Sequence, residues 1–125
     1  MKTDIHPFKV AIPSSALEEL KQRLQRTRWP EKETCDDWSQ GIPLDYTREL
    51  AHYWATDYDW RRFEKKLNNW SQYVTNIEGI DIHFIHHRSP HEDALPLIIS
   101  HGWPGSIVEF HKIIAALANP TAHGG

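Results

Sequence analysis

The stretch best suited to chemistry is a glycine-rich loop of six residues, His101-Gly102-Trp103-Pro104-Gly105-Ser106. An apolar run at 94–99 precedes this loop, and an amphipathic run at 107–114 follows it. The order predicts a strand-to-helix turn whose backbone amides lie near a helix N-terminus. Amides in that position stabilise developing negative charge, because their N–H groups have no partner within the helix and the helix dipole is positive there.

The elements on either side of the loop are predicted from their apolar patterns. Residues 97–99 are apolar without alternation, which predicts a strand that is covered on both faces. Ser106 and Glu109 have the spacing of a capping box, with Ser106 as the N-cap. One apolar helical face follows, formed by Ile107, Phe110, Ile114 and Leu117. We also expect a cis bond between Trp103 and Pro104, since tight functional turns retain such isomers.

Two other groups of side chains are candidate metal ligands, but neither has a suitable spacing. The histidines are His83, His86, His87 and His91, and the acidic residues are Glu31, Glu33, Asp36 and Asp37. In an extended strand, His83 and His86 point to opposite faces. The four carboxylates lack the regular ligand spacing of a calcium loop, which favours a solvated connector. The sequence therefore predicts no metal and no other cofactor.

The remainder of the chain is predicted to contain three helices and a hairpin. Helices are expected over 15–28, 43–54 and 59–70, and their aromatic and leucine stripes are typical of packing faces. From residue 72 the period changes to two, which predicts an antiparallel hairpin over 73–85 with a turn at Glu78-Gly79. We therefore divide the chain into a helical segment at 1–70 and the start of an α/β core at 71–125.

Composition excludes several classes of partner. The net charge of −3 gives no electrostatic reason to expect nucleic acid. Cys35 is the only cysteine, which excludes an internal disulfide and favours a reducing, cytoplasmic location. Residues 1–7 are too polar for a signal peptide, and no apolar run approaches the ~20 residues of a membrane span. We expect a soluble protein that does not bind membranes.

The six-residue loop, placed after an apolar strand, resembles the oxyanion loop of α/β-hydrolase epoxide hydrolases of the microsomal and juvenile-hormone type. Further stretches resemble the N-terminal region of that family in order and spacing, namely residues 27–30, 41–46, 58–61, 67–68 and 80–84. The resemblance runs from about Phe8 to Gly125. One departure is Trp70-Ser71-Gln72-Tyr73, where the family more usually has a proline before the glutamine.

This resemblance implies an incomplete α/β-hydrolase fold and a role for the loop. The backbone N–H of Trp103 is expected to form part of an oxyanion hole, which stabilises the charge formed when water attacks an aspartyl ester. Five loop residues are expected to shape it, namely His101, Gly102, Pro104, Gly105 and Ser106. The nucleophilic aspartate, two lid tyrosines and the water-activating histidine of the family have no counterpart in this segment.

We therefore expect residues 1–125 to be the N-terminal portion of an enzyme that converts small-molecule epoxides to diols, and to be inactive alone. Two alternatives remain. In the first, the chain is a non-catalytic binding or complementation module, and a partner chain carries the catalytic triad. In the second, the chain belongs to another α/β-hydrolase such as a dehalogenase. Because few neighbours cover the apolar strand, self-association is also expected.

Overall fold

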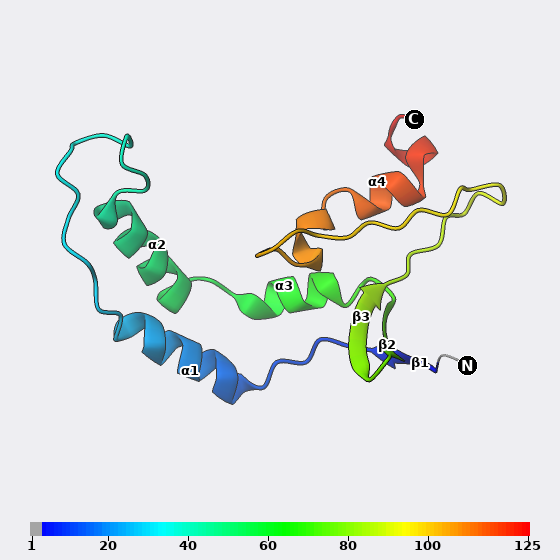
Figure 1. The fold of residues 1–125 in the computed structure, drawn as a ribbon, viewed down its shortest axis with the longest axis horizontal. Helices are drawn as coiled ribbons and strands as arrows, with labels where there is room; N and C mark the ends of the chain where they lie inside the picture. Colours follow the sequence, from blue (N-terminus) through cyan, green and yellow to red (C-terminus); the bar gives the residue numbers. More distant parts are fainter. Residues whose placement is uncertain (1–3) are drawn as a thin grey trace. The chain divides into compact units, whose positions relative to one another are not determined.

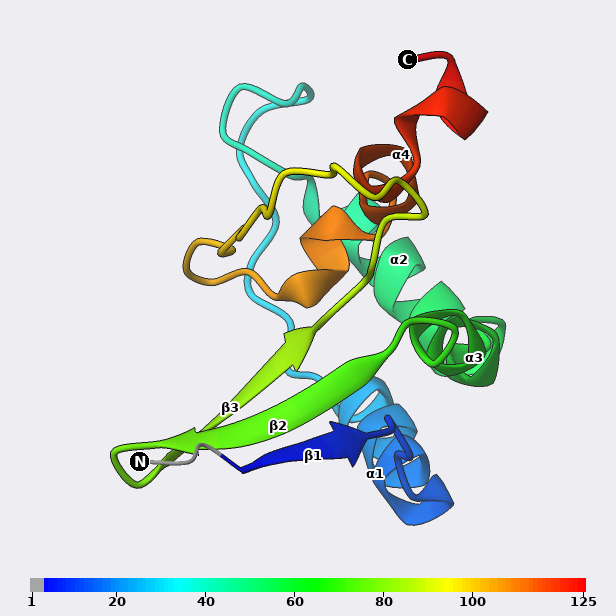
Figure 2. The same cartoon turned by 90° about the vertical axis from the view of Figure 1, so that its right-hand side faces the viewer.

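The computed structural model describes residues 4–125, and its strands form one small antiparallel sheet in the order β1-β2-β3. The strands are β1 (Ile5–Phe8), β2 (Gln72–Ile77) and β3 (Ile80–Ile85). Figure 2 shows the three strands side by side, with β2 in the middle. The alternating pattern after residue 72 thus forms the predicted hairpin, and a strand from the start of the chain is added to its other edge.

The hairpin turn has the two residues that its backbone requires. Glu78 and Gly79 have positive φ values of 51° and 86°, as in the two-residue turns that match the twist of paired strands. Asn76 completes the turn, since its Oδ1 accepts from the Gly79 N–H at 3.0 Å and its Nδ2 donates to Asp81 at 2.7 Å. This geometry confirms the turn predicted at this dipeptide.

The strand β1 is held at its C-terminal end by the side chain of Asn68. The Oδ1 atom of Asn68 accepts from the Val10 N–H at 2.9 Å, and its Nδ2 donates to the Val10 carbonyl at 2.8 Å. In the ladder, Ile5 lies opposite Thr75 and Phe8 lies opposite Gln72. A polar side chain after α3 (Trp60–Leu67) therefore fixes a segment that lies 58 residues earlier in the sequence.

The helical segment contains the helices α1 (Ser14–Gln25) and α2 (Leu44–Thr56), which pack against each other (Figure 1). Both were predicted, with small differences at their ends. The spacing of Ser15 and Glu18 predicts a capping box with Ser15 as the N-cap, and this prediction is wrong, because the helix already begins at Ser14 and Pro13 occupies the N-cap position without a side-chain bond. A proline at this boundary fixes φ near the helical value and has no N–H that needs a partner.

The connector between α1 and α2 fixes the start of α2 through two charged residues, Glu33 and Lys32. The carboxylate of Glu33 accepts from the Leu44 N–H at 2.9 Å, and this bond lowers the pKa of Glu33. Lys32 pairs with Asp45 at 2.9 Å, which lowers the pKa of that carboxyl group. These contacts give Glu33 and Lys32 a structural role at the start of α2.

The long-range contacts divide the chain into two units. One unit contains the described residues up to Val10 together with Phe63–Gly125, and the other contains Ala11–Arg62. The division at residue 70 that we draw from the sequence stays a prediction. Within 4–125, no helix has the length and apolar character needed to cross a membrane.

The segment before the loop corrects a sequence-based expectation. Residues 97–99 do not form the predicted buried strand, and their exposed fractions are 64%, 94% and 43% for Leu97, Ile98 and Ile99. A strand that is covered on both faces needs neighbours on both edges. The sheet of the described chain contains only β1, β2 and β3, none of which pairs with this segment.

The helix predicted after the loop is also interrupted. It forms a short 3₁₀ turn, η1 (Ile107–Phe110), and then α4 (Ile114–Ala118), followed by a second 3₁₀ turn, η2 (Pro120–His123). The apolar positions of this segment remain partly exposed, with Ile113 at 43% and Leu117 at 50%. Tertiary packing of the apolar face supplies most helical stability, so a continuous helix is not favoured here.

Candidate functional site: the loop at residues 101–106

The C-terminal end of the loop is fixed by Ser106, which caps η1 as predicted. Its backbone is extended, with φ of −156°, and its Oγ accepts from the Val108 N–H at 3.3 Å. The Glu109 N–H donates to the Ser106 carbonyl at 3.0 Å, and the Ser106 side chain accepts from Val108 instead, so the N-cap is confirmed but the predicted capping box with Glu109 is wrong. The polypeptide therefore changes from an extended path to a helical turn at this residue.

The centre of the loop is organised around one carbonyl group. The Gly102 carbonyl accepts from the Gly105 N–H at 2.8 Å and lies 3.0 Å from Nδ1 of His101. The bond between Trp103 and Pro104 is cis, as predicted. Two residues of the loop, His101 and Gly105, thus contact a single peptide oxygen.

The amide that sequence analysis selected is available for a ligand. Throughout residues 4–125, no acceptor is bonded to the Trp103 N–H, and the Trp103 residue is 97% exposed. The predicted oxyanion donor is therefore not used by secondary structure. Its assignment to that role stays a prediction.

Gly105 occupies a position without room for a side chain. A Cβ atom built there would lie 1.6 Å from the Oε1 atom of Glu109 and 2.8 Å from the Gly102 carbonyl oxygen. The first contact involves a flexible carboxylate, which can move away. The second involves backbone that is already hydrogen bonded, so a side chain at this position would displace the Gly102 carbonyl.

Two of the histidines considered as metal ligands, His83 and His91, have other partners. His83 lies 3.0 Å from Oε1 of Gln72 and packs against the ring of Phe8, and burial lowers the pKa of His83. His91 lies 3.2 Å from the hydroxyl of Thr121. Across 4–125, the structure brings no three His, Cys, Asp or Glu side chains together as a metal would require.

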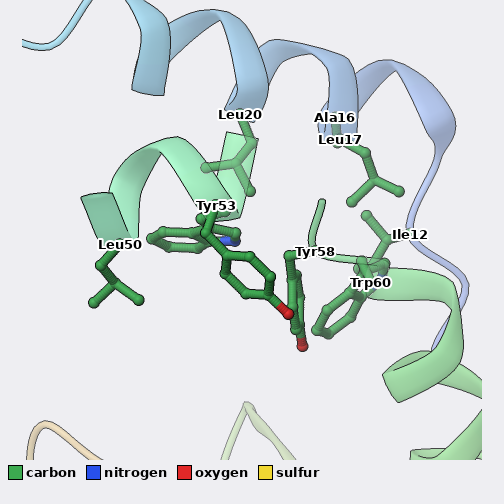
Figure 3. A pocket seen from close by; sticks show the side chains of 9 residues that line it. Ile12, Ala16, Leu17, Leu20, Leu50, Tyr53, Tyr58 and Trp60 are labelled. Atoms are coloured by element: carbon green, nitrogen blue, oxygen red, sulfur yellow. The ribbon is translucent and has the colours of Figure 1, made fainter. Parts of the chain in front are cut away.

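The structure also contains a groove that sequence reasoning missed. It lies within the helical unit, has a volume of about 600 Å³, and is shown in Figure 3. Its walls are apolar and aromatic, and are formed by Ile12, Ala16, Leu17, Leu20, Leu50, Tyr53, Trp54, Tyr58 and Trp60. The rings of Tyr53 and Tyr58 meet edge to face with centroids 6.2 Å apart. The stripes interpreted as packing faces include most of these residues, but not Ile12, Ala16 or Tyr58, and they did not indicate that the residues line open space.

The loop geometry and the elements before it define the first part of an α/β-hydrolase. Two solved structures support this class. An epoxide hydrolase from Aspergillus niger matches with a TM-score of 0.81 and 36% identity, over 90% of this chain and 30% of that one. The juvenile hormone epoxide hydrolase of Bombyx mori matches with a TM-score of 0.77 and 28% identity, over 89% of this chain and 27% of that one.

Sequence comparison then gives the family. Residues 5–110 match the family described as epoxide hydrolase N terminus, and the chain belongs to this family. A Stigmatella aurantiaca protein that is provisionally named an epoxide hydrolase is 58% identical over 121 residues, which cover 97% of this chain and 28% of the relative. Epoxide hydrolase 1 of Oryctolagus cuniculus is 37% identical over 124 residues, which cover 96% of this chain and 27% of that relative. The chain thus spans little more than a quarter of these two relatives.

Proposed function

We propose that residues 1–125 form the N-terminal portion of an enzyme that hydrolyses small-molecule epoxides to diols. The observation that carries this proposal is that the Trp103 N–H has no acceptor within residues 4–125. This donor lies in the loop of a chain that belongs to the epoxide hydrolase N-terminus family. Such a donor serves a reaction in which an oxygen atom becomes negatively charged.

The loop acts in the second half of the proposed reaction. An aspartate from the remainder of the enzyme first opens the epoxide and forms an ester. Water then adds to the ester carbonyl carbon, and the carbonyl oxygen becomes an oxyanion that accepts from the Trp103 N–H. When the C=O bond re-forms, the ester C–O bond breaks, and the departing diol oxygen takes up the proton lost by the attacking water.

The proposal requires that the chain be inactive by itself and active when completed. The test replaces the matching segment of the Stigmatella aurantiaca relative by residues 1–125, and measures diol formation from styrene oxide and other small epoxides. We expect turnover by this hybrid and by the unmodified relative, and none above buffer by residues 1–125 alone. Turnover by the isolated chain that a substitution within it abolishes would contradict the proposal.

Self-association of the isolated chain is a second part of the proposal. Large apolar side chains are exposed in the segment before the loop, where Leu95 is 90% exposed and Ile98 is 94% exposed. Apolar surface of this kind favours association. Sedimentation velocity is expected to show species larger than a monomer at raised concentration, and a single compact monomer at every concentration would contradict this part.

A further inference from the structure

We infer that His101 and Gly105 are positioning residues for the Trp103 amide, which they aim through the Gly102 carbonyl. The inference rests on the proposed function of the loop as an oxyanion donor. It adds which atoms direct that donor and which residues supply these atoms.

The Gly102 carbonyl and the Trp103 N–H belong to the same peptide unit. A peptide unit is planar, and in the trans form its C=O and N–H point in opposite directions. Any interaction that fixes the Gly102 oxygen therefore fixes the direction of the Trp103 N–H. The orientation of the donor is therefore set at one edge of the peptide unit, and the oxyanion lies at the opposite edge.

Two donors converge on the Gly102 oxygen. The first is the Gly105 N–H, at 2.8 Å. The second is Nδ1 of His101, at 3.0 Å. Because a carbonyl oxygen can only accept, His101 must carry a proton on Nδ1 to make this bond. With both donors in place, the peptide plane cannot rotate without losing two hydrogen bonds.

This geometry distinguishes positioning from proton transfer. A histidine that acts as a general base must be neutral, whereas the Nδ1–H donor remains when the ring is protonated. A side chain with a fixed donor at the same place therefore suffices for positioning. Asparagine meets this condition, because its Nδ2 lies at the position of histidine Nδ1, and leucine has the same branched shape without a donor.

Gly105 contributes by the absence of a side chain. A Cβ atom there would lie 2.8 Å from the Gly102 oxygen, which is closer than carbon and oxygen approach without displacement. The substitution Gly105→Ala would therefore rotate the peptide unit that carries the Trp103 N–H.

The experiment compares two steps of the reaction in the hybrid enzyme. Rapid mixing followed by mass spectrometry measures the formation and decay of the covalent ester. For His101→Leu and Gly105→Ala we expect ester decay to slow by about 10–100-fold, less than the ~10²–10³-fold typical of deleting an oxyanion donor. Ester formation should be unchanged, because it needs no oxyanion donor. His101→Asn should restore decay to within about threefold, with an unchanged pH–rate profile.

A matched control removes a similar bond elsewhere. Nδ1 of His111 lies 2.7 Å from the Val108 carbonyl, so this bond involves neither atom of the Gly102–Trp103 peptide unit. His111→Leu is expected to lower the melting temperature without changing the ratio of ester decay to ester formation. A change of that ratio as large as in His101→Leu would overturn the inference, since general destabilisation would then explain both.

A second measurement needs no activity. In the 125-residue chain, ¹⁵N spectra of the labelled histidines are expected to place the proton of neutral His101 on Nδ1. A proton on Nε2 alone, or normal ester decay in His101→Leu, would overturn the positioning role. Failure of the unmodified hybrid to turn over any epoxide would instead overturn the proposed function. The tautomer measurement would still decide whether His101 Nδ1 donates to the Gly102 carbonyl.

Discussion

The contact between Asn68 and Val10 gives the sharpest prediction about stability. This side chain supplies both the acceptor for the Val10 N–H and the donor for the Val10 carbonyl, at 2.9 and 2.8 Å. The substitution Asn68→Asp keeps the shape and the acceptor. It replaces the donor by a carboxylate oxygen that faces the Val10 carbonyl, so one bond is lost and a repulsive contact is formed.

The size of the effect follows from the two bonds. A hydrogen bond contributes about 0.5–1.5 kcal/mol net, and a polar group left without a partner costs about 1–3 kcal/mol. Because the site is partly buried, we expect Asn68→Asp to lower the free energy of unfolding by about 1.5–3 kcal/mol near neutral pH. Protonation of the introduced carboxyl restores a donor, so the loss should shrink at about pH 4.

Urea unfolding measures this difference, with Asn69→Asp as the matched control. Asn69 is the next residue and is exposed, so the same change of charge is made there without touching Val10. Hydrogen exchange should be faster in β1 for Asn68→Asp only. The reasoning is refuted if the two variants unfold within about 0.5 kcal/mol of each other at neutral pH, or if the low-pH recovery is absent.

Three further predictions concern other features. Burial lowers the pKa of His83 below 6.5, so the unfolded chain binds a proton at this ring more readily than the folded chain does. The free energy of unfolding should therefore fall as the pH drops from 6.5 through the lowered pKa, and His83→Asn should flatten this dependence in urea titrations. Gly79→Ala should cost about 1 kcal/mol in the same assay, because the space is open but φ is +86°. Lys32→Ala should shift the urea midpoint slightly and only in low salt, since its pair with Asp45 is exposed; a shift that persists in high salt would contradict this.

Local patterns predicted much of the fold correctly. The hairpin follows from alternation and from Glu78-Gly79, whose positive φ values are a local property of the turn. The helices α1 and α2 follow from apolar periodicity. In each case the signal and the structure lie within the same few residues, so a single sequence is sufficient.

Non-local contacts account for the features that were predicted wrongly or missed. Residues 97–99 have the composition of a buried strand, but a strand needs hydrogen-bonded neighbours that the described sheet does not offer. Asn68 has no sequence signal that relates it to Val10, which lies 58 residues earlier. The role of Glu33 at the start of α2 was also not visible in the sequence, because its partner Leu44 lies 11 residues later.

The sequence selected the residues of the candidate site but not the geometry of the loop, and their roles stay predictions. The resemblance selected Trp103, and the cis bond at Pro104 was expected from the turn. That a single oxygen, on Gly102, receives two donors depends on the coordinates of the loop. Sequence spacing gives the order of such groups but not the direction in which a peptide unit faces.

The pairing of β1 with β2 has a consequence for synthesis on the ribosome. Phe8 pairs with Gln72, so β1 leaves the ribosome before any residue with which it pairs. At about 5–20 residues per second, this delay lasts about 3–13 s, long enough for the intervening helices to form first. During that time Pro7, which has no N–H, interrupts the row of donors that a nascent strand would offer to other chains. A chaperone that binds nascent apolar segments would therefore encounter this chain while β1 is still unpaired.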